Sequence, residues 1–164
     1  MTATSIMTQD LTLLRSNDTV KDGLRLMHEK KVRTLPVVDD EGGFVGLFGI
    51  RQVVHLLLPK AAQIVDGLTD LSFMPDDEDE LHARIEAVDD EPVSAYLEAA
   101  DDLLICEPTT PLPEVLELLH LSFNTSLPVL VVDNESKSLV GMVSGWDILE
   151  KIVMDVVRDN HNGG

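Results

Sequence analysis

Ser144 and Asp147 stand three residues apart at the expected start of the last helix, where a hydroxyl and a carboxylate can act together. The first backbone N–H groups of a helix have no partner within it, and Ser and Asp oxygens commonly accept their hydrogen bonds. A hydroxyl beside free N–H groups can also hold a phosphate, because the N-terminus of a helix favours anions. The pair therefore indicates either a helix cap or a small-molecule site, and its spacing alone leaves both open.

Other residues with metal-binding or catalytic side chains have structural interpretations. His28 and His120 occupy equivalent places in the two halves of the chain, but no carboxylate or cysteine lies at ligand spacing beside both, so we expect solvent-facing helix positions. The acidic run 76–80 lacks the central glycine of a calcium loop and suits the first turn of a helix, whose dipole favours carboxylates. Cys106 has no visible general base and is predicted to be a small apolar residue at a strand end. The sequence thus predicts no metal, no required cofactor and no catalytic residue, so an enzyme is the least favoured class.

The charge of the chain disfavours several classes of partner. Its 164 residues carry a net charge of −18, so we expect no nucleic acid and no membrane among its partners. Residues 76–102 hold much of this charge, for which solubility is the simplest explanation. No apolar run approaches the roughly 20 residues that span a bilayer, and the first residues lack the basic region of a signal peptide. A single cysteine excludes an internal disulfide, and we expect a cytoplasmic location.

The chain contains an internal repeat that predicts its architecture. Residues 11–46 are echoed by residues 103–141, and the motif Leu-Pro-Val at 35–37 matches the same motif at 127–129. Apolar periodicity and turn residues predict strand–helix–strand–strand–helix in each copy. In copy 1 the expected elements are a strand at 11–14, a helix at 20–30, a hairpin of strands 35–38 and 44–48, and a helix at 50–58. In copy 2 they are a strand at 103–105, a helix opening at 109–111, a hairpin of strands 128–132 and 139–143, and a helix at 146–157.

An insert separates the two copies and is predicted to be helical. Helix-spaced apolar residues lie at 61–68, a second helix starts near 75–77 and extends to Val88, and a short third one starts at Pro92. The fold class is therefore α/β, with two β-α-β-β-α units related by a pseudo-twofold axis, because each copy has an apolar face that it cannot bury alone. The expected organisation is repeat 1 at 1–58, an acidic helical insert at 59–99 and repeat 2 at 100–164.

Several of these phrases resemble a known family. The runs Leu35–Asp39 and Leu127–Asp133, each followed by a glycine-led strand, are similar to the cystathionine-β-synthase (CBS) domain, as is the opening Ile6-Met7-Thr8. The run from Gly141 to Ile148 resembles the end of that domain. CBS domains occur in tandem pairs, so the resemblance implies a stand-alone CBS pair of the bacterial type. The insert lies outside the matching motifs.

The resemblance also implies a ligand. CBS pairs often bind AMP, ADP, ATP or S-adenosylmethionine in the clefts between the two copies. Their typical motif is Gly-apolar-apolar-Thr/Ser-x-x-Asp, where the last strand enters the last helix. At that place a carboxylate would accept hydrogen bonds from both ribose hydroxyls, and a hydroxyl with free N–H groups would hold a phosphate.

The two copies differ at this motif. Copy 2 has Ser144 and Asp147, whereas copy 1 has Gly49 and Gln52 at the corresponding positions, and an amide is a weaker acceptor than a carboxylate. The sequence therefore predicts one competent site and one degenerate site. By family resemblance, the predicted site residues are the motif residues Ser144, Gly145, Trp146 and Asp147, the base-pocket residues Leu104, Ile105, Cys106 and Val129, and the phosphate contacts Arg33 and Arg51. Because the chain has only 12 Lys and Arg, a nucleoside or a ligand with few phosphates is favoured over ATP.

The leading functional hypothesis is a non-catalytic sensor of an adenosine-type ligand, which would act on a regulated protein that the sequence leaves unknown. The ligand would stabilise one arrangement of the two copies, and the partner would respond to that arrangement. A homodimer is expected through the apolar residues of the last helix, which are Ile148, Leu149, Ile152, Val153 and Val156. The alternative is a ligand-free interaction or dimerisation module whose acidic insert at 59–99 docks a basic partner. Trp146 fits either hypothesis, since it could cover a ligand or pack in a subunit interface.

Overall fold

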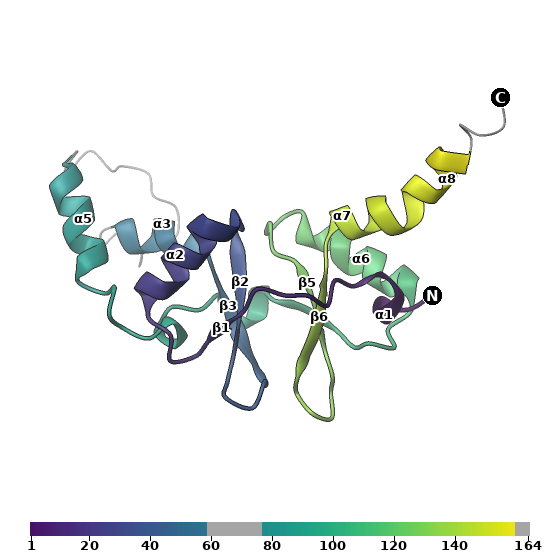
Figure 1. The fold of residues 1–164 in the computed structure, drawn as a ribbon, viewed down its shortest axis with the longest axis horizontal. Coiled ribbons are helices and arrows are strands. Elements are labelled where there is room, and N and C mark those ends of the chain that lie inside the picture. Colours follow the sequence, from purple (N-terminus) through teal and green to yellow (C-terminus); the bar gives the residue numbers. More distant parts are fainter. Residues whose placement is uncertain (59–76, 160–164) are drawn as a thin grey trace. The chain divides into compact units, whose positions relative to one another are not determined.

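Two compact units make up the part of the chain that the structure describes. The computed structural model describes residues 1–58 and 77–159 (Figure 1). Unit 1 contains Met1–Thr12, Val38–Phe44 and the chain from Ala99 onward, and unit 2 contains Leu13–Val37 and Val45–Glu98. Unit 1 therefore joins repeat 2 to the first residues of the chain, and unit 2 joins most of repeat 1 to the end of the insert.

Repeat 1 forms a three-stranded sheet in the order β1-β2-β3. Its elements are β1 (Leu14–Arg15), α2 (Val20–Lys30), β2 (Thr34–Val38), β3 (Phe44–Gly49) and α3 (Ile50–Leu57). The strand predicted at 11–14 is wrong in its bounds, because only its last residue lies in β1. Apolar residues alone do not make a strand, since each strand residue also needs a hydrogen-bonding neighbour. The other predicted elements of this repeat are confirmed to within one residue at each end.

Helix α2 begins where the sequence predicts, because Thr19 caps it. The Thr19 hydroxyl accepts a hydrogen bond from the Asp22 N–H (3.1 Å), and the Asp22 carboxylate accepts one from the Thr19 N–H (3.0 Å). This reciprocal pair is a capping box, which satisfies two N–H groups at the start of the helix. The hydrogen bonds with Thr19 lower the pKa of Asp22. The apolar face of α2 is buried in a core made of Leu14, Val20, Met27, Leu35, Val37, Phe48 and Val93.

Two predicted elements of the insert lie in unit 2, and one lies outside the described residues. Helix α5 (Glu78–Glu86) starts at the Asp77 cap as predicted, but it ends before Val88. The 3-10 turn η1 (Val93–Ala95) follows Pro92, and the side chain of Val93 is fully buried. The helix predicted at 61–68 lies outside the described residues.

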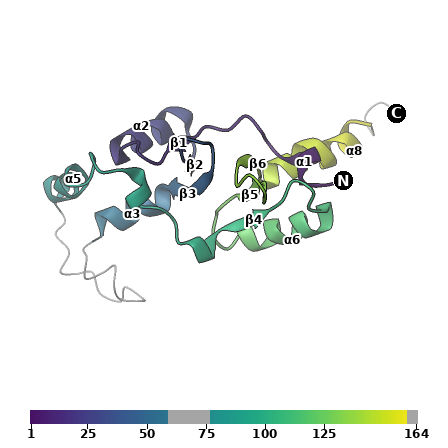
Figure 2. The ribbon, with the colours of Figure 1, turned by 90° about the horizontal axis from the view of Figure 1, so that it is seen from below.

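Repeat 2 also forms a three-stranded sheet, in the order β4-β5-β6. Its strands are β4 (Leu104–Cys106), β5 (Val129–Val132) and β6 (Leu139–Val143), where β4 and β5 pair in parallel and β5 and β6 pair antiparallel. Helix α6 (Leu112–Ser122) packs on β4 and β5, and α1 (Ala3–Ile6) packs on β6 (Figures 1 and 2). A 3-10 turn, η2 (Ala100–Asp102), precedes β4. The core residues of this unit are Ala3, Ile6, Met7, Cys106, Val115, Leu119, Val129, Val131 and Val143.

The helix predicted at 146–157 is confirmed and has an internal irregularity. It consists of three consecutive helical parts, which are α7 (Gly145–Ile148), a π-helical turn (Leu149–Val153) and α8 (Met154–Asp159). We call this stretch the final helical run. A π-helical turn is rare and often occurs at functional sites. None of the helices in the described ranges combines the length and the apolar character needed to cross a membrane.

Each unit includes a short segment that comes just before the other repeat in the sequence. The N-terminal segment, Met1–Thr12, precedes repeat 1 but packs with repeat 2 in unit 1, and the end of the insert at Glu98 precedes repeat 2 but packs with repeat 1 in unit 2. In unit 1, Thr8 N–H donates to Met142 O (2.8 Å), and Met142 N–H donates back to Thr8 O (3.0 Å). In unit 2, Glu98 N–H donates to Leu47 O in the same way (2.8 Å). Thr8 and Glu98 therefore hold equivalent places, one beside each final strand.

The glycine that opens each motif is explained by this close approach. A Cβ on Gly141 would lie 2.6 Å from Met7 Sδ, and a Cβ on Gly46 would lie 2.8 Å from Leu97 Cδ1. A side chain at either position would require the Met7 or Leu97 side chain to shift, and at Gly141 the backbone oxygen of Thr8, 3.0 Å from the added Cβ, would be crowded as well.

Candidate functional site

Ser144 and Asp147 meet at the start of the final helical run. Ser144 has an extended backbone and serves as the N-cap, and Asp147 lies in the first turn. Ser144 N–H donates to Asp147 Oδ2 (2.8 Å), and the Ser144 hydroxyl donates to the same oxygen (3.2 Å). The structure therefore contains the helix-capping arrangement that the residue types predict.

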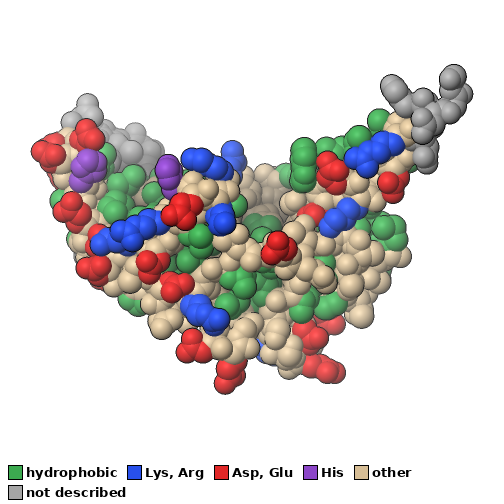
Figure 3. All heavy atoms as spheres, in the orientation of Figure 1, with side chains coloured by type: hydrophobic (Ala, Val, Ile, Leu, Met, Phe, Trp, Pro, Cys, Tyr) green, Lys and Arg blue, Asp and Glu red, His purple; other side chains and the backbone are tan. Residues whose placement is uncertain are grey.

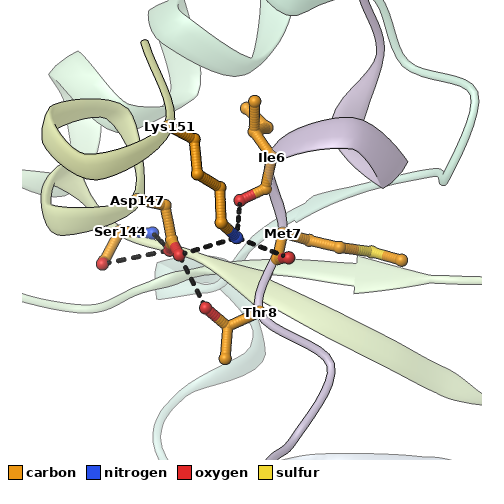
Figure 4. A network of polar contacts seen from close by, with 6 residues as sticks. All are labelled: Ile6, Met7, Thr8, Ser144, Asp147 and Lys151. Atoms are coloured by element: carbon orange, nitrogen blue, oxygen red, sulfur yellow. Dashed lines mark hydrogen bonds and ion pairs between the residues drawn. The ribbon is translucent and has the colours of Figure 1, made fainter. Parts of the chain in front are cut away.

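The second oxygen of Asp147 is also engaged. The Thr8 hydroxyl donates to Asp147 Oδ1 at 2.6 Å, and Lys151 Nζ lies 3.3 Å from the same atom (Figure 4). The residue is only 7% exposed, so its charge depends on these partners rather than on water. Thr8 comes from the N-terminal segment, which sequence spacing could not place here. Lys151 lies four residues after Asp147, a spacing at which helical side chains meet, so the sequence pattern alone could have indicated this ion pair.

Lys151 ties the N-terminal segment to the final helical run. Its Nζ donates to Ile6 O (2.7 Å) and Met7 O (2.8 Å) in addition to its contact with Asp147. An ammonium group has three N–H donors, so these three acceptors use all of them. Figure 4 shows Lys151 reaching the carbonyl groups of the segment and Asp147 together.

The four predicted base-pocket residues do not all share one face. Leu104 is aligned with Val129 in the parallel pairing, so these side chains and that of Cys106 point to the same side of the sheet. Val129 and Cys106 are buried in the core of unit 1, and Leu104 packs against it. Ile105 points to the opposite side and is 47% exposed. Burial raises the pKa of the Cys106 thiol, and the hydrogen bond with Thr110 offsets this only in part, so the thiol stays protonated at neutral pH.

Gly49 and Gln52 repeat the capping contact of the second copy. Gly49 is the N-cap of α3, and its N–H donates to Gln52 Oε1 (2.9 Å). A Cβ at Gly49 would lie 2.6 Å from the backbone oxygen of Arg33, so the motif hydroxyl has no room there. Repeat 1 thus keeps the cap and lacks both the hydroxyl and the carboxylate of the motif.

The two predicted phosphate contacts lie in unit 2, whereas Ser144 and Asp147 lie in unit 1. Arg33 accepts the Ile50 N–H with its backbone oxygen (2.8 Å), and its side chain is exposed. Arg51 Nη1 pairs with Glu98 Oε2 at 3.3 Å, and the Glu98 side chain is only 4% exposed. Within the described ranges, Glu98 Oε1 is buried without a hydrogen-bond partner. Arg51 therefore balances a buried carboxylate that the sequence did not single out.

The remaining candidates have the following places. Trp146 is 68% exposed, and Gly145 has space around its Cα, since the nearest atom to an added Cβ is Phe123 Cε1 at 3.9 Å. His28 and His120 are both exposed. The residues that the structure describes contain no group of three or more His, Cys, Asp or Glu side chains that could hold a metal ion.

Comparison with known proteins identifies the architecture. A family model for the CBS domain matches residues 3–59 and 93–154. The CBS-pair protein CBSX2 from Arabidopsis thaliana has the same fold, with 25% identity and a TM-score of 0.67 over 96% of each chain. A structure of CBSX2 in complex with AMP has 22% identity and a TM-score of 0.64, covering 94% of this chain and 98% of that one. A CBS domain protein from Streptococcus pneumoniae has 19% identity and a TM-score of 0.67, covering 96% and 85%. This chain therefore belongs to the CBS-domain family and contains a tandem pair of CBS domains.

Proposed function

We propose that this CBS pair is a non-catalytic regulatory module that binds an adenosine-type ligand at the start of the final helical run. The observation that carries this proposal is the pairing of the Asp147 carboxylate with the Ser144 hydroxyl at a helix N-terminus. The structurally similar CBSX2 in complex with AMP supports an adenosine nucleotide as the ligand. AMP, ADP, ATP and S-adenosylmethionine all carry the ribose that this carboxylate would recognise.

The roles of the two residues follow from their chemistry. A carboxylate has two acceptor oxygens, so Asp147 would accept hydrogen bonds from both ribose hydroxyls. The Ser144 hydroxyl and the first N–H groups of the helix would face the phosphate, which the helix dipole favours. Phe123 and Trp146 are exposed beside this helix start and offer apolar surface to the ligand.

Charge favours a ligand with few phosphates. Lys151 Nζ pairs with Asp147, and two backbone carbonyls and the carboxylate occupy its three donors. It is therefore not available to a phosphate chain without losing contacts that hold the N-terminal segment. We expect AMP to bind more tightly than ATP, because each added phosphate brings charge into a protein with a net charge of −18.

Calorimetric titration with AMP tests the site. Asp147→Ala should weaken AMP binding by about 10- to 100-fold, since hydrogen bonds to a charged group contribute about 1.5–3 kcal/mol each. Gln52→Ala is the matched control, because it removes the equivalent cap in repeat 1 and should leave AMP affinity within about twofold of the parent. Equal AMP affinity in Asp147→Ala and the parent would show that the site lies elsewhere.

A second candidate function, docking of a basic partner by the acidic insert, has one observation in its favour. Helix α5 begins with Glu78, Asp79 and Glu80, and the first two of these are exposed. Asp90 and Glu91 extend the exposed acidic surface, part of which Figure 3 shows over α5. Charge reversal of Glu78 and Asp79 to Lys should abolish capture of a basic partner and leave AMP binding unchanged. Loss of AMP binding in that variant would contradict the separation of the two functions.

A further inference from the structure

The hydrogen-bonding capacity of the Asp147 carboxylate is already full. A carboxylate has about four acceptor positions, two on each oxygen. Ser144 N–H and the Ser144 hydroxyl occupy Oδ2, and the Thr8 hydroxyl and Lys151 occupy Oδ1. A ribose that binds this carboxylate must therefore displace donors that the protein itself supplies.

The four donors are not equally replaceable. Ser144 N–H is fixed by the backbone at the helix cap, and Lys151 is anchored by the carbonyls of Ile6 and Met7. The two hydroxyls are each held by one side-chain torsion. The Ser144 hydroxyl makes the longer bond to Asp147 (3.2 Å) and in the proposed site turns to the phosphate, whereas the Thr8 hydroxyl makes the shorter bond (2.6 Å) and has no phosphate to face. Thr8 is otherwise an exposed residue. Its backbone pairing with Met142 does not depend on where the hydroxyl points. Thr8 can therefore release Asp147 by a rotamer change, without moving the chain.

We propose that Thr8 is a built-in competitor for the ligand, whose hydroxyl gives up Asp147 Oδ1 to a ribose hydroxyl. The inference rests on the proposed function and adds a residue that sets the affinity of its site. Part of the binding free energy replaces the 2.6 Å bond from Thr8, so the observed affinity is lower than the contacts of the ligand alone would give. Lys151 keeps its place in both states and positions the carboxylate.

This exchange couples the site to the N-terminal segment. The Thr8–Asp147 bond is one of the contacts that attach this segment to repeat 2, and ligand binding removes it. By linkage, a partner that pulls the segment away would raise ligand affinity by the same factor by which the ligand weakens the attachment. The site would thus respond to whatever protein holds the first residues of the chain.

The test compares AMP binding to Thr8→Val, Thr8→Ser and the parent by calorimetry. Valine keeps the shape of threonine and removes the competing hydroxyl, so the Kd of Thr8→Val should fall by about 3- to 10-fold. The same variant should unfold about 2–5 °C lower without ligand, because a buried carboxylate loses a donor. Thr8→Ser keeps the hydroxyl and should bind AMP within about twofold of the parent. Tighter binding together with lower stability is the signature of competition, since a merely structural role would lower both.

A second ligand isolates the ribose contact. AMP that lacks both ribose hydroxyls, 2′,3′-dideoxy-AMP, has nothing to exchange with Thr8, so Thr8→Val should not improve its binding. Equal or weaker AMP binding by Thr8→Val, or an equal gain for the dideoxy ligand, would overturn the proposed exchange while leaving the site in place. No AMP binding by the parent or by any variant would overturn the proposed function and this inference with it.

Discussion

Gln52 and Asp147 make the same backbone contact and differ in charge. Each accepts a hydrogen bond from the N–H of the residue that begins its helix. The paired segments differ as well, since Thr8 pairs with β6 at the place equivalent to where Glu98 pairs with β3, and the buried Glu98 carboxylate binds Arg51. In unit 1 the carboxylate, Asp147, lies in the helix and the hydroxyl of Thr8 lies in the paired segment. In unit 2 the carboxylate, Glu98, lies in the paired segment. Equivalent positions in the duplicated fold therefore support different chemistry.

Restoring the motif hydroxyl in repeat 1 should harm the protein. In Gly49→Ser the new Cβ would lie 2.6 Å from Arg33 O, which is backbone and cannot rotate away. We expect a loss of about 1–3 kcal/mol in the free energy of unfolding, as is typical of overpacking, measured by urea denaturation. AMP should still bind at one site per chain.

Gly145→Ala provides the control for this substitution. The nearest atom to its new Cβ is 3.9 Å away, an ordinary contact, so stability should stay equal or rise by about 0.5–1 kcal/mol. Undiminished stability in Gly49→Ser, or a second AMP site in that variant, would contradict the steric explanation for the missing hydroxyl.

The sequence identified the cap but not the residues that complete the site. Ser144 and Asp147 are close in sequence, and the preference of their side chains for helix starts is a local property. Thr8 and Glu98 come from segments that precede the opposite repeat, so their contacts are set by tertiary structure. Local sequence patterns do not show which segment packs against which repeat. For this reason the contacts of Glu98 with Arg51 and of Thr8 with Asp147 were not predicted.

At the scale of elements, the π-helical turn of the final helical run supplies the contact to the N-terminal segment. Residues 149–153 include Lys151, whose side chain bridges Asp147 in the run to the carbonyls of Ile6 and Met7 in the N-terminal segment. Helix α1 and the strand-like residue Thr8 flank these carbonyls. The turn thus carries the clamp that attaches the segment to repeat 2.

Removing this clamp should loosen the N-terminal segment selectively. Lys151→Met keeps the aliphatic stem and removes three charge-assisted contacts, so we expect a loss of about 1–3 kcal/mol in the free energy of unfolding. Amide exchange of Thr8 and Met142, whose N–H groups pair the segment with β6, should accelerate more than exchange in α2.

Lys30→Met is the control, because Lys30 is an exposed residue at the end of α2 in the other unit. It should change neither the exchange of Thr8 nor that of Met142. Equal protection of these amides in Lys151→Met and the parent would mean that the strand pairing alone holds the segment.

The elements themselves were largely predictable, and the exceptions have a physical reason. Nearby residues determine both ends of helix α2. Thr19 and Asp22 form a capping box at its start, and Lys31 adopts a left-handed conformation with φ of 56° at its end. Strand β1 has no such local signal, because its length is decided by which residues find a hydrogen-bonding neighbour. The π-helical turn was equally hidden, since apolar periodicity does not distinguish it from the α-helix around it.

At the scale of the molecule, the final helical run has one apolar side that unit 1 leaves uncovered. Ile148 and Ile152 pack against the core of the unit. They therefore do not belong to the outer face, although the sequence led us to expect them there. The exposed apolar residues of the run are Trp146, Leu149, Val153, Val156 and Val157. Their spacing of three and four residues places them along one stripe, and Figure 3 shows hydrophobic side chains along this run. An exposed apolar stripe of this kind is typical of an association surface.

We expect the chain to form a homodimer through this stripe. Val153 and Val156 are 42% and 64% exposed, and burying a valine side chain contributes about 1.5–3 kcal/mol, so lysine at either position should weaken the dimer by about tenfold or more. Sedimentation velocity over a concentration series measures the change. Leu116→Lys, on the exposed side of α6, is the control and should leave the dimer intact. A parent chain that sediments as a monomer at every concentration, or a dimer that both valine variants leave unchanged, would show that the stripe is not a dimer interface. Trp146 would then be free to cover the proposed ligand site.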